Sequence, residues 1–164
     1  MRILGVDPGL AHTGWGVIET RGNRLYCLEH GSIVTGKESE QPLRLNEIFE
    51  SLIELIQGFD PDLMAVESLY FAKNRRSAIP VAEARGAVLI SAAQKGIPLV
   101  SYTPLEIKQA LTGNGRAEKA QVQEMVRLML GLQEIPRPDH AADALAAAVC
   151  SYHMYQFEQR KELR

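Results

Sequence analysis

The feature that most constrains the fold is a short apolar run near the start of the chain that ends in a carboxylate and a turn. Residues 3–6 are Ile-Leu-Gly-Val, and Asp7-Pro8-Gly9 follows directly. This pattern is typical of a buried strand that stops at a turn, which would place Asp7 at the end of the strand, where a metal ligand could sit. The alternative is a simple Pro-Gly turn in which Asp7 accepts backbone hydrogen bonds.

Glycines are frequent around this carboxylate. Gly9, Gly14 and Gly16 let the backbone turn tightly and let a bulky group approach, because no β-carbon is in the way. The β-prone segments 12–19 and 24–34 are separated by an Arg-Gly-Asn turn, which predicts an antiparallel hairpin. Three neighbouring strands are therefore expected early in the chain.

A second apolar run that ends in an acid lies further along. Residues 63–66 are Leu-Met-Ala-Val, and Glu67 follows, so a second buried strand would carry a carboxylate at its end. A helical region from about Ser77 to Lys95 and a short strand at 99–102 come next. Strand, helix and strand in this order imply parallel pairing through a crossover, and hence an α/β domain.

The other predicted helices follow from apolar residues at helical spacing. They cover about residues 45–57, 104–111, 122–130 and 139–157. A capping box at Thr103-Pro104-Leu105-Glu106 marks the start of the second of these helices. We expect one domain over residues 1–157, followed by a polar tail, 158–164, that frays.

Composition restricts the class of protein. Of the 164 residues, 46% are hydrophobic and 23% are charged, which excludes a disordered or fibrous chain. The formal net charge is -2, so a nucleic acid would have to be held by a local basic face. Cys27 and Cys150 lack ligand spacing, and no signal peptide or membrane-length apolar run is recognisable. We expect a soluble cytoplasmic protein without membrane contact.

The last predicted helix adds His140 and Asp143, three residues apart and therefore on one helical face. The alanines around them would let that face approach a sheet closely. Acids that converge from Asp7, Glu67 and Asp143 would repel one another without cations, and hard divalent ions prefer oxygen ligands. Two such ions can catalyse phosphodiester hydrolysis. The alternative for the helix is that Asp139 caps it and the first-turn acids only favour its dipole.

Basic and aromatic side chains that could contact a nucleic acid lie near these acids in the sequence. The basic residues are Lys73, Arg75 and Arg76 after Glu67, and Lys108, Arg116 and Lys119 around a glycine loop. Tyr70 and Phe71 could offer a ring to an exposed base. The alternatives are solvated surface for the charged stretches and core packing for the two aromatic residues.

At this point the chain resembles the RuvC family of Holliday junction resolvases, in the RNase H-like (retroviral integrase) superfamily. The motifs, in the family's order and spacing, are Gly5-Val6-Asp7-Pro8-Gly9, Thr13-Gly14-Trp15-Gly16-Val17, Val66-Glu67-Ser68-Leu69-Tyr70-Phe71-Ala72-Lys73-Asn74, Ala84-Arg85-Gly86, Ile107-Lys108-Gln109, Gly115-Arg116-Ala117-Glu118-Lys119 and Ala141-Ala142-Asp143-Ala144-Leu145-Ala146. The resemblance implies an RNase H-like fold with a five-stranded mixed sheet flanked by helices on both faces.

The resemblance also implies an activity. A homodimeric crossover junction endodeoxyribonuclease would resolve four-way (Holliday) DNA junctions in recombination and repair. Paired nicks in strands of like polarity would leave 5′-phosphate and 3′-hydroxyl ends, with two Mg²⁺ or Mn²⁺ ions per subunit. The RuvA-RuvB branch migration complex is the implied helicase partner. The Ala-rich helix at 77–95 is our candidate for the dimer contact, since small side chains permit close approach.

The resemblance assigns roles to individual residues. Asp7, Glu67 and Asp143 match the metal-binding acids, Tyr70 an aromatic position that stacks at the crossover, and Lys108 and Lys119 basic positions important for cleavage. Lys119 would stabilise developing charge in the transition state.

Many family members have aspartate where this chain has His140, whereas others have histidine. Because imidazole is a softer ligand than carboxylate, we expect His140 in the metal site to shift activity towards Mn²⁺. Whether the preceding Asp139 is a ligand or a helix cap stays open at this stage.

Three other functions compete with this interpretation. A sugar kinase or actin-like ATPase also places Asp and Gly after its first strand, but it needs two such domains. An RNase H would cut RNA:DNA hybrids. A junction-binding scaffold would bind the same DNA without cleaving it.

Overall fold

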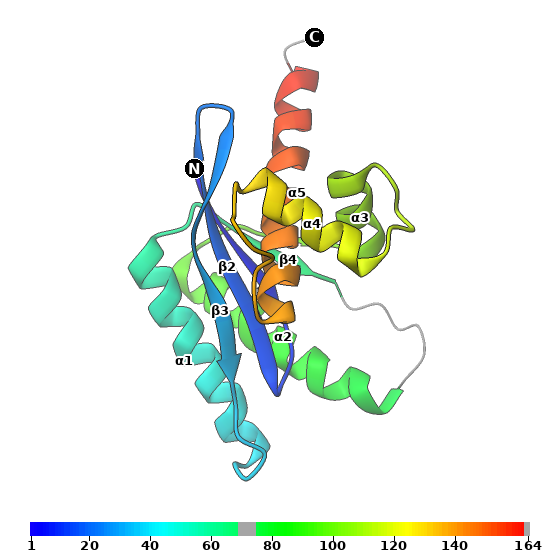
Figure 1. The fold of residues 1–164 in the computed structure, drawn as a ribbon. Coiled ribbons are helices and arrows are strands. Elements are labelled where there is room, and N and C mark those ends of the chain that lie inside the picture. The colour runs from blue at the N-terminus through cyan, green and yellow to red at the C-terminus, as the bar shows by residue number, and fades with distance from the viewer. Residues whose placement is uncertain (69–74, 163–164) are drawn as a thin grey trace.

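The computed structural model describes residues 1–68 and 75–162 (Figure 1). Its centre is a five-stranded sheet in the order β3-β2-β1-β4-β5. The strands are β1 (Arg2–Asp7), β2 (His12–Arg21), β3 (Arg24–Val34), β4 (Leu63–Glu67) and β5 (Leu99–Tyr102). β1, β2 and β3 pair antiparallel, whereas β4 is parallel to both β1 and β5. The predicted hairpin and parallel crossover are therefore confirmed.

Helices cover both faces of this sheet (Figure 1). The helices are α1 (Gln41–Phe59), α2 (Arg75–Lys95), α3 (Pro104–Thr112), α4 (Lys119–Met129) and α5 (Asp139–Glu162). One core lies between the sheet and the pair α1 and α2. The other lies beneath α5, against which α3 and α4 pack. The expected five-stranded mixed sheet flanked by helices on both faces is confirmed.

The two cores follow from the alternation of side chains along a strand, because successive residues point to opposite faces. In β1, Leu4 and Val6 belong to the core under α1 and α2. Ile3, the residue before Leu4, points to the opposite face and belongs to the core under α5. The residues of β1 at positions 3, 5 and 7 therefore share the face that α5 covers.

Helix α5 packs unusually close to the sheet because small residues meet on both sides of the contact. A β-carbon on Gly5 would overlap with the backbone carbonyl oxygen of Ala144, and one on Gly14 would overlap with that of His140. The alanines from Ala141 to Ala148 are all buried. The close approach expected from these alanines is confirmed, and it brings the first turn of α5 beside the end of β1.

Helix boundaries differ from the prediction at several ends. Helix α1 begins at Gln41, inside a segment expected to be loop, because a proline is well tolerated in the first turn. Helix α5 continues past the expected end at Phe157 to Glu162, through residues that are mostly good helix formers. The predicted capping box is confirmed: Thr103 Oγ1 accepts from Glu106 N at 3.2 Å, and Glu106 Oε2 accepts from Thr103 N at 2.7 Å. Among the helices of the described ranges, none is long and apolar enough to cross a membrane.

Candidate active site

The two strand-end acids lie side by side because of strand register. β1 and β4 are parallel neighbours with Val6 opposite Val66, so Asp7 and Glu67 follow at the same end of adjacent strands. Val6 and Val66 both pack under α1 and α2. The next residue of each strand therefore points to the face covered by α5. Both carboxylates are thus directed towards the first turns of that helix.

Helix α5 supplies the remaining members of the cluster. His140 Nδ1 lies 2.8 Å from Asp7 Oδ2 and donates a hydrogen bond to it. Potential ligand atoms of Asp7, His140 and Asp143 all lie within 4.8 Å of one another. The side chain of Asp7 is 18% exposed, whereas that of His140 is 46% exposed. The sequence positions 7, 140 and 143 are therefore brought into one partly buried group.

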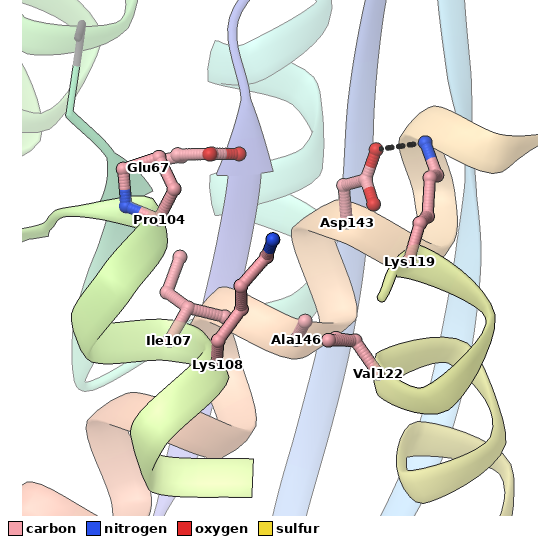
Figure 2. A pocket seen from close by; sticks show the side chains of 8 residues that line it. All are labelled: Glu67, Pro104, Ile107, Lys108, Lys119, Val122, Asp143 and Ala146. Atoms are coloured by element: carbon pink, nitrogen blue, oxygen red, sulfur yellow. Dashed lines mark hydrogen bonds and ion pairs between the residues drawn. The ribbon is translucent and has the colours of Figure 1, made fainter. Parts of the chain in front are cut away.

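Glu67 lies outside this tight group but faces the same space. It lines a pocket of about 240 Å³ together with Pro104, Ile107, Lys108, Lys119, Val122, Asp143 and Ala146. Figure 2 shows the carboxylates of Glu67 and Asp143 on opposite sides of this pocket, with the Lys108 amine directed into it between them. Of the four predicted metal ligands, Glu67 and Asp143 therefore line this pocket, while Asp7 and His140 adjoin Asp143 in the tight group.

The pKa values show how these acids affect one another. Burial raises the pKa of Glu67 to about 7, and the charges of Asp7 and Asp143 add to the shift. Burial also raises the pKa of Asp7, and the Asp143 charge adds to this effect, against the hydrogen bond from His140 that lowers it. Because like charges crowd together in a poorly solvated place, the site favours a bound cation.

Lysine side chains partly neutralise this charge. Lys119 Nζ donates to Asp143 Oδ2 at 2.8 Å and lies 3.7 Å from Asp139 Oδ2. Burial alone would lower the pKa of Lys119, but the hydrogen bond and charge of Asp143 outweigh it, so the pKa is raised. The ammonium therefore stays charged and occupies one side of Asp143.

The donor set fits a divalent metal ion. Carboxylate oxygens suit Mg²⁺ and Mn²⁺, and an imidazole nitrogen suits the softer Mn²⁺. Neighbouring ligands on an octahedral ion of this size are about 3 Å apart. The 2.8 Å between His140 Nδ1 and Asp7 Oδ2 is close to that spacing, so an ion that takes the place of the shared proton would be within reach of both atoms. Asp7, His140 and Asp143 are therefore suited to hold one ion, and Glu67 is placed to contribute from the opposite side of the pocket.

Asp139, which the sequence leaves open between metal ligand and helix cap, lies outside the group of Asp7, His140 and Asp143. It is the first residue of α5, and the carbonyl of Pro138 accepts from Ala141 N at 2.9 Å, so Pro138 holds the capping position. The interpretation of Asp139 as the helix cap is wrong. Its carboxylate instead accepts from Arg137 at 2.6 Å. Asp139 is outside the tight group, and its carboxylate lies between Arg137 and Lys119.

The structure brings only some of the predicted DNA-binding residues to this pocket. Lys108 and Lys119 line it. Arg116 is exposed in the turn between α3 and α4, outside the pocket lining. Arg75 and Arg76 begin α2, and their side chains are outside the described part of the chain, as are Tyr70, Phe71 and Lys73 altogether.

One residue beside the cluster was missed by the sequence analysis. His12 is the first residue of β2, and its ring stacks on that of His140 with centroids 5.7 Å apart and planes 8° apart. Its signal was available in the sequence: His12, Gly14 and Gly16 alternate along one strand and so share the face that the helix approaches.

The raised pKa of Glu67 makes the free energy of unfolding depend on pH. The folded protein holds this proton more tightly than the unfolded chain, whose glutamate titrates at its ordinary value of 4.5. Without metal, the free energy of unfolding should therefore fall as pH rises from 4.5 to about 7. The contribution of this group is about 3–4 kcal/mol, because the two pKa values differ by about 2.5 and each pKa unit corresponds to about 1.4 kcal/mol.

The substitution Glu67→Gln should remove this dependence and make the metal-free protein more stable than wild type at pH 8. Urea unfolding of both proteins at pH 5 and pH 8 measures the difference. Glu54→Gln, at an exposed position on α1, is the matched control and should leave the dependence unchanged. Equal slopes for wild type and Glu67→Gln would show that Glu67 does not titrate in this range.

Comparison with known proteins identifies close relatives. The family model described as "Crossover junction endodeoxyribonuclease RuvC" matches residues 3–151. A protein of that name from Treponema denticola is 53% identical over 152 residues, which cover 93% of this chain and 85% of the relative. The structure is similar to Thermus thermophilus RuvC, with a TM-score of 0.90, 37% identity and coverage of 96% of this chain and 97% of the other. It also matches T. thermophilus RuvC in complex with Holliday junction substrate, with a TM-score of 0.88, 35% identity and coverage of 96% of each chain.

Proposed function

Because the chain belongs to the RuvC family of crossover junction endodeoxyribonucleases, we propose that it binds four-way DNA junctions and cuts them in a metal-dependent reaction. The main support is the meeting of Asp7, His140 and Asp143 within 4.8 Å at the ends of β1 and α5. The negative charges of these acids would repel one another without a bound cation. Lysines next to them could bind the phosphates of DNA.

Each side chain of the site has a role in this proposal. Asp7, Glu67, His140 and Asp143 would hold divalent ions, which would supply Lewis acidity and an activated water when bound. Asp7 occupies the central position, because it touches His140 and its pKa responds to the charge of Asp143. Lys119 is positioned beside Asp143 to stabilise negative charge on the phosphate as it develops. Lys108 is directed into the pocket, where it would contact the DNA backbone (Figure 2).

The finer reaction follows from the same family relationship. We propose that two Mg²⁺ or Mn²⁺ ions bind per subunit and that the products carry 5′-phosphate and 3′-hydroxyl ends. A four-way junction has approximate two-fold symmetry, so a two-fold dimer could cut two strands of like polarity with identical sites. Junction migration by a RuvA-RuvB helicase complex would supply the substrate.

Helix α2 is the proposed dimer contact. Ile79 and Ile90, three helical turns apart on one face, are 64% and 61% exposed. Gly86 lies on the same face, and a β-carbon there would meet nothing within 4 Å in the subunit. Such an apolar face with small residues permits close helix packing between copies. Light scattering at working concentration should give the mass of a dimer, and a monomer would contradict the proposal.

Cleavage assays on defined substrates test the function. We expect a mobile synthetic four-way junction, incubated with protein and Mg²⁺ or Mn²⁺, to yield nicked duplexes, while linear duplex and an RNA:DNA hybrid stay intact. Preferred cutting of the hybrid would indicate an RNase H instead. Junction binding without cleavage in either metal would indicate a scaffold. ATP hydrolysis by the same preparation would favour the kinase and ATPase class.

The imidazole of His140 should influence the choice of metal. We expect His140→Asp to lower the ratio of the cleavage rate in Mn²⁺ to that in Mg²⁺ by about tenfold, because an all-oxygen site favours the harder ion. Parallel titrations of both metals with wild type and variant measure this ratio. An unchanged ratio would argue against His140 as a ligand.

A further inference from the structure

His12 stands at the meeting point of the sheet and helix α5. It begins β2, and it alternates with Gly14 and Gly16 on the strand face that α5 covers. The absence of a β-carbon at Gly14 lets the backbone of His140 come into contact with the strand. His12, at the start of the strand, is the next residue on this face. Its ring is stacked on the ring of His140.

The contact is geometrically well defined. The two imidazole centroids are 5.7 Å apart, and the ring planes are nearly parallel at 8°. One edge of the His140 ring is held by Asp7 through the 2.8 Å hydrogen bond. The side chain of His140 is nevertheless 46% exposed, so a single hydrogen bond would leave its ring free to swing about the terminal torsion. The ring of His12 lies parallel to the His140 ring on one side.

We propose that His12 is a positioning residue for His140, whose ring it holds by parallel stacking in the plane that directs a nitrogen towards Asp7 and Asp143. The inference rests on the proposed role of His140 as a metal ligand. It assigns His12 no ligand role itself, because the group of potential ligand atoms in the described residues consists of Asp7, His140 and Asp143.

Two substitutions distinguish the effect of the flat His12 ring from the effect of its nitrogen atoms. His12→Phe keeps a flat ring and removes both nitrogens, whereas His12→Ala removes the ring. Removing a side chain that orients a metal-bound histidine typically weakens metal binding by about 10–100-fold. We therefore expect the alanine variant to bind Mn²⁺ about tenfold more weakly than wild type and the phenylalanine variant to restore most of the affinity.

The first measurement is the binding of Mn²⁺ to DNA-free protein, followed by calorimetry. The second is the NMR chemical shifts of the His140 ring protons in metal-free protein. His12→Ala should move those shifts, and His12→Phe should keep them under the ring current of a stacked neighbour. Arg24→Ala is the control, because Arg24 is exposed at the other end of the β2–β3 hairpin, away from His12. It should leave affinity and shifts unchanged.

The outcomes separate this inference from the proposed function. Equal loss of affinity in the phenylalanine and alanine variants would overturn positioning by stacking, because a ring nitrogen of His12 would then be the active feature. Unchanged affinity and shifts in His12→Ala would overturn it as well. If His140→Ala itself leaves Mn²⁺ affinity unchanged, the proposed ligand role of His140 fails and the inference fails with it.

Discussion

Replacing Asp7 by Asn is expected to reduce junction cleavage by at least about a thousandfold while junction binding changes by less than about threefold. The substitution keeps the shape of a side chain that is only 18% exposed and removes the negative charge at the centre of the cluster. Asp7 lies against His140 and its pKa responds to Asp143, so no neighbour can replace it. The phosphate contacts that we propose for Lys108 and Lys119 would not require that charge.

Single-turnover cleavage of a labelled junction and a gel-shift assay with the same junction measure the two effects. Asp62→Asn is the matched control, because Asp62 lies just before β4 at the opposite end of the sheet, where it accepts from Arg2 N at 2.7 Å. It removes the same charge far from the cluster and should leave cleavage near the wild-type rate. Substantial cleavage by Asp7→Asn would remove Asp7 from the site.

Replacing Gly14 by Ala is expected to lower both stability and activity. A β-carbon at this position would overlap with the carbonyl oxygen of His140, so the first turn of α5 must move away from the sheet. Overpacking of this kind costs about 1–3 kcal/mol. A shift of about 1 Å in catalytic groups costs about a hundredfold in rate, which we expect for junction cleavage because both His140 and Asp143 move.

Urea unfolding and single-turnover cleavage of Gly14→Ala measure the two losses. Gly58→Ala makes the same change in α1, where a β-carbon would meet nothing within 4 Å. This control should raise the free energy of unfolding by about 0.5–1 kcal/mol through helix propensity, without a change in cleavage. Wild-type stability and rate in Gly14→Ala would show that α5 does not need its close approach to the sheet.

Much of the site could be predicted from the sequence because strand geometry leaves few choices. Asp7 and Glu67 each follow an apolar run of strand length, and parallel neighbours end at the same edge of a sheet. Their shared face also follows from alternation, since Val6 and Val66 pack into one core. His140 and Asp143 are predictable as one helical face, and their alanine neighbours indicate close packing.

Other features depend on contacts that a linear pattern does not contain. The ion pair between Arg137 and Asp139 depends on the path of the loop before α5. The lining of the pocket beside Glu67 by residues of α3 and α4 depends on how these helices pack against α5. The stack of His12 on His140 depends on the contact at Gly14, which only the folded chain brings about.

A crystal structure grown with Mn²⁺ tests the central claim most directly, because anomalous scattering locates the ion independently of any assay. We predict an anomalous peak within about 2.5 Å of a carboxylate oxygen of Asp7, with His140 or Asp143 completing the contact. A saturated crystal that shows manganese bound elsewhere and none beside Asp7 would contradict the assignment of these residues as a metal centre.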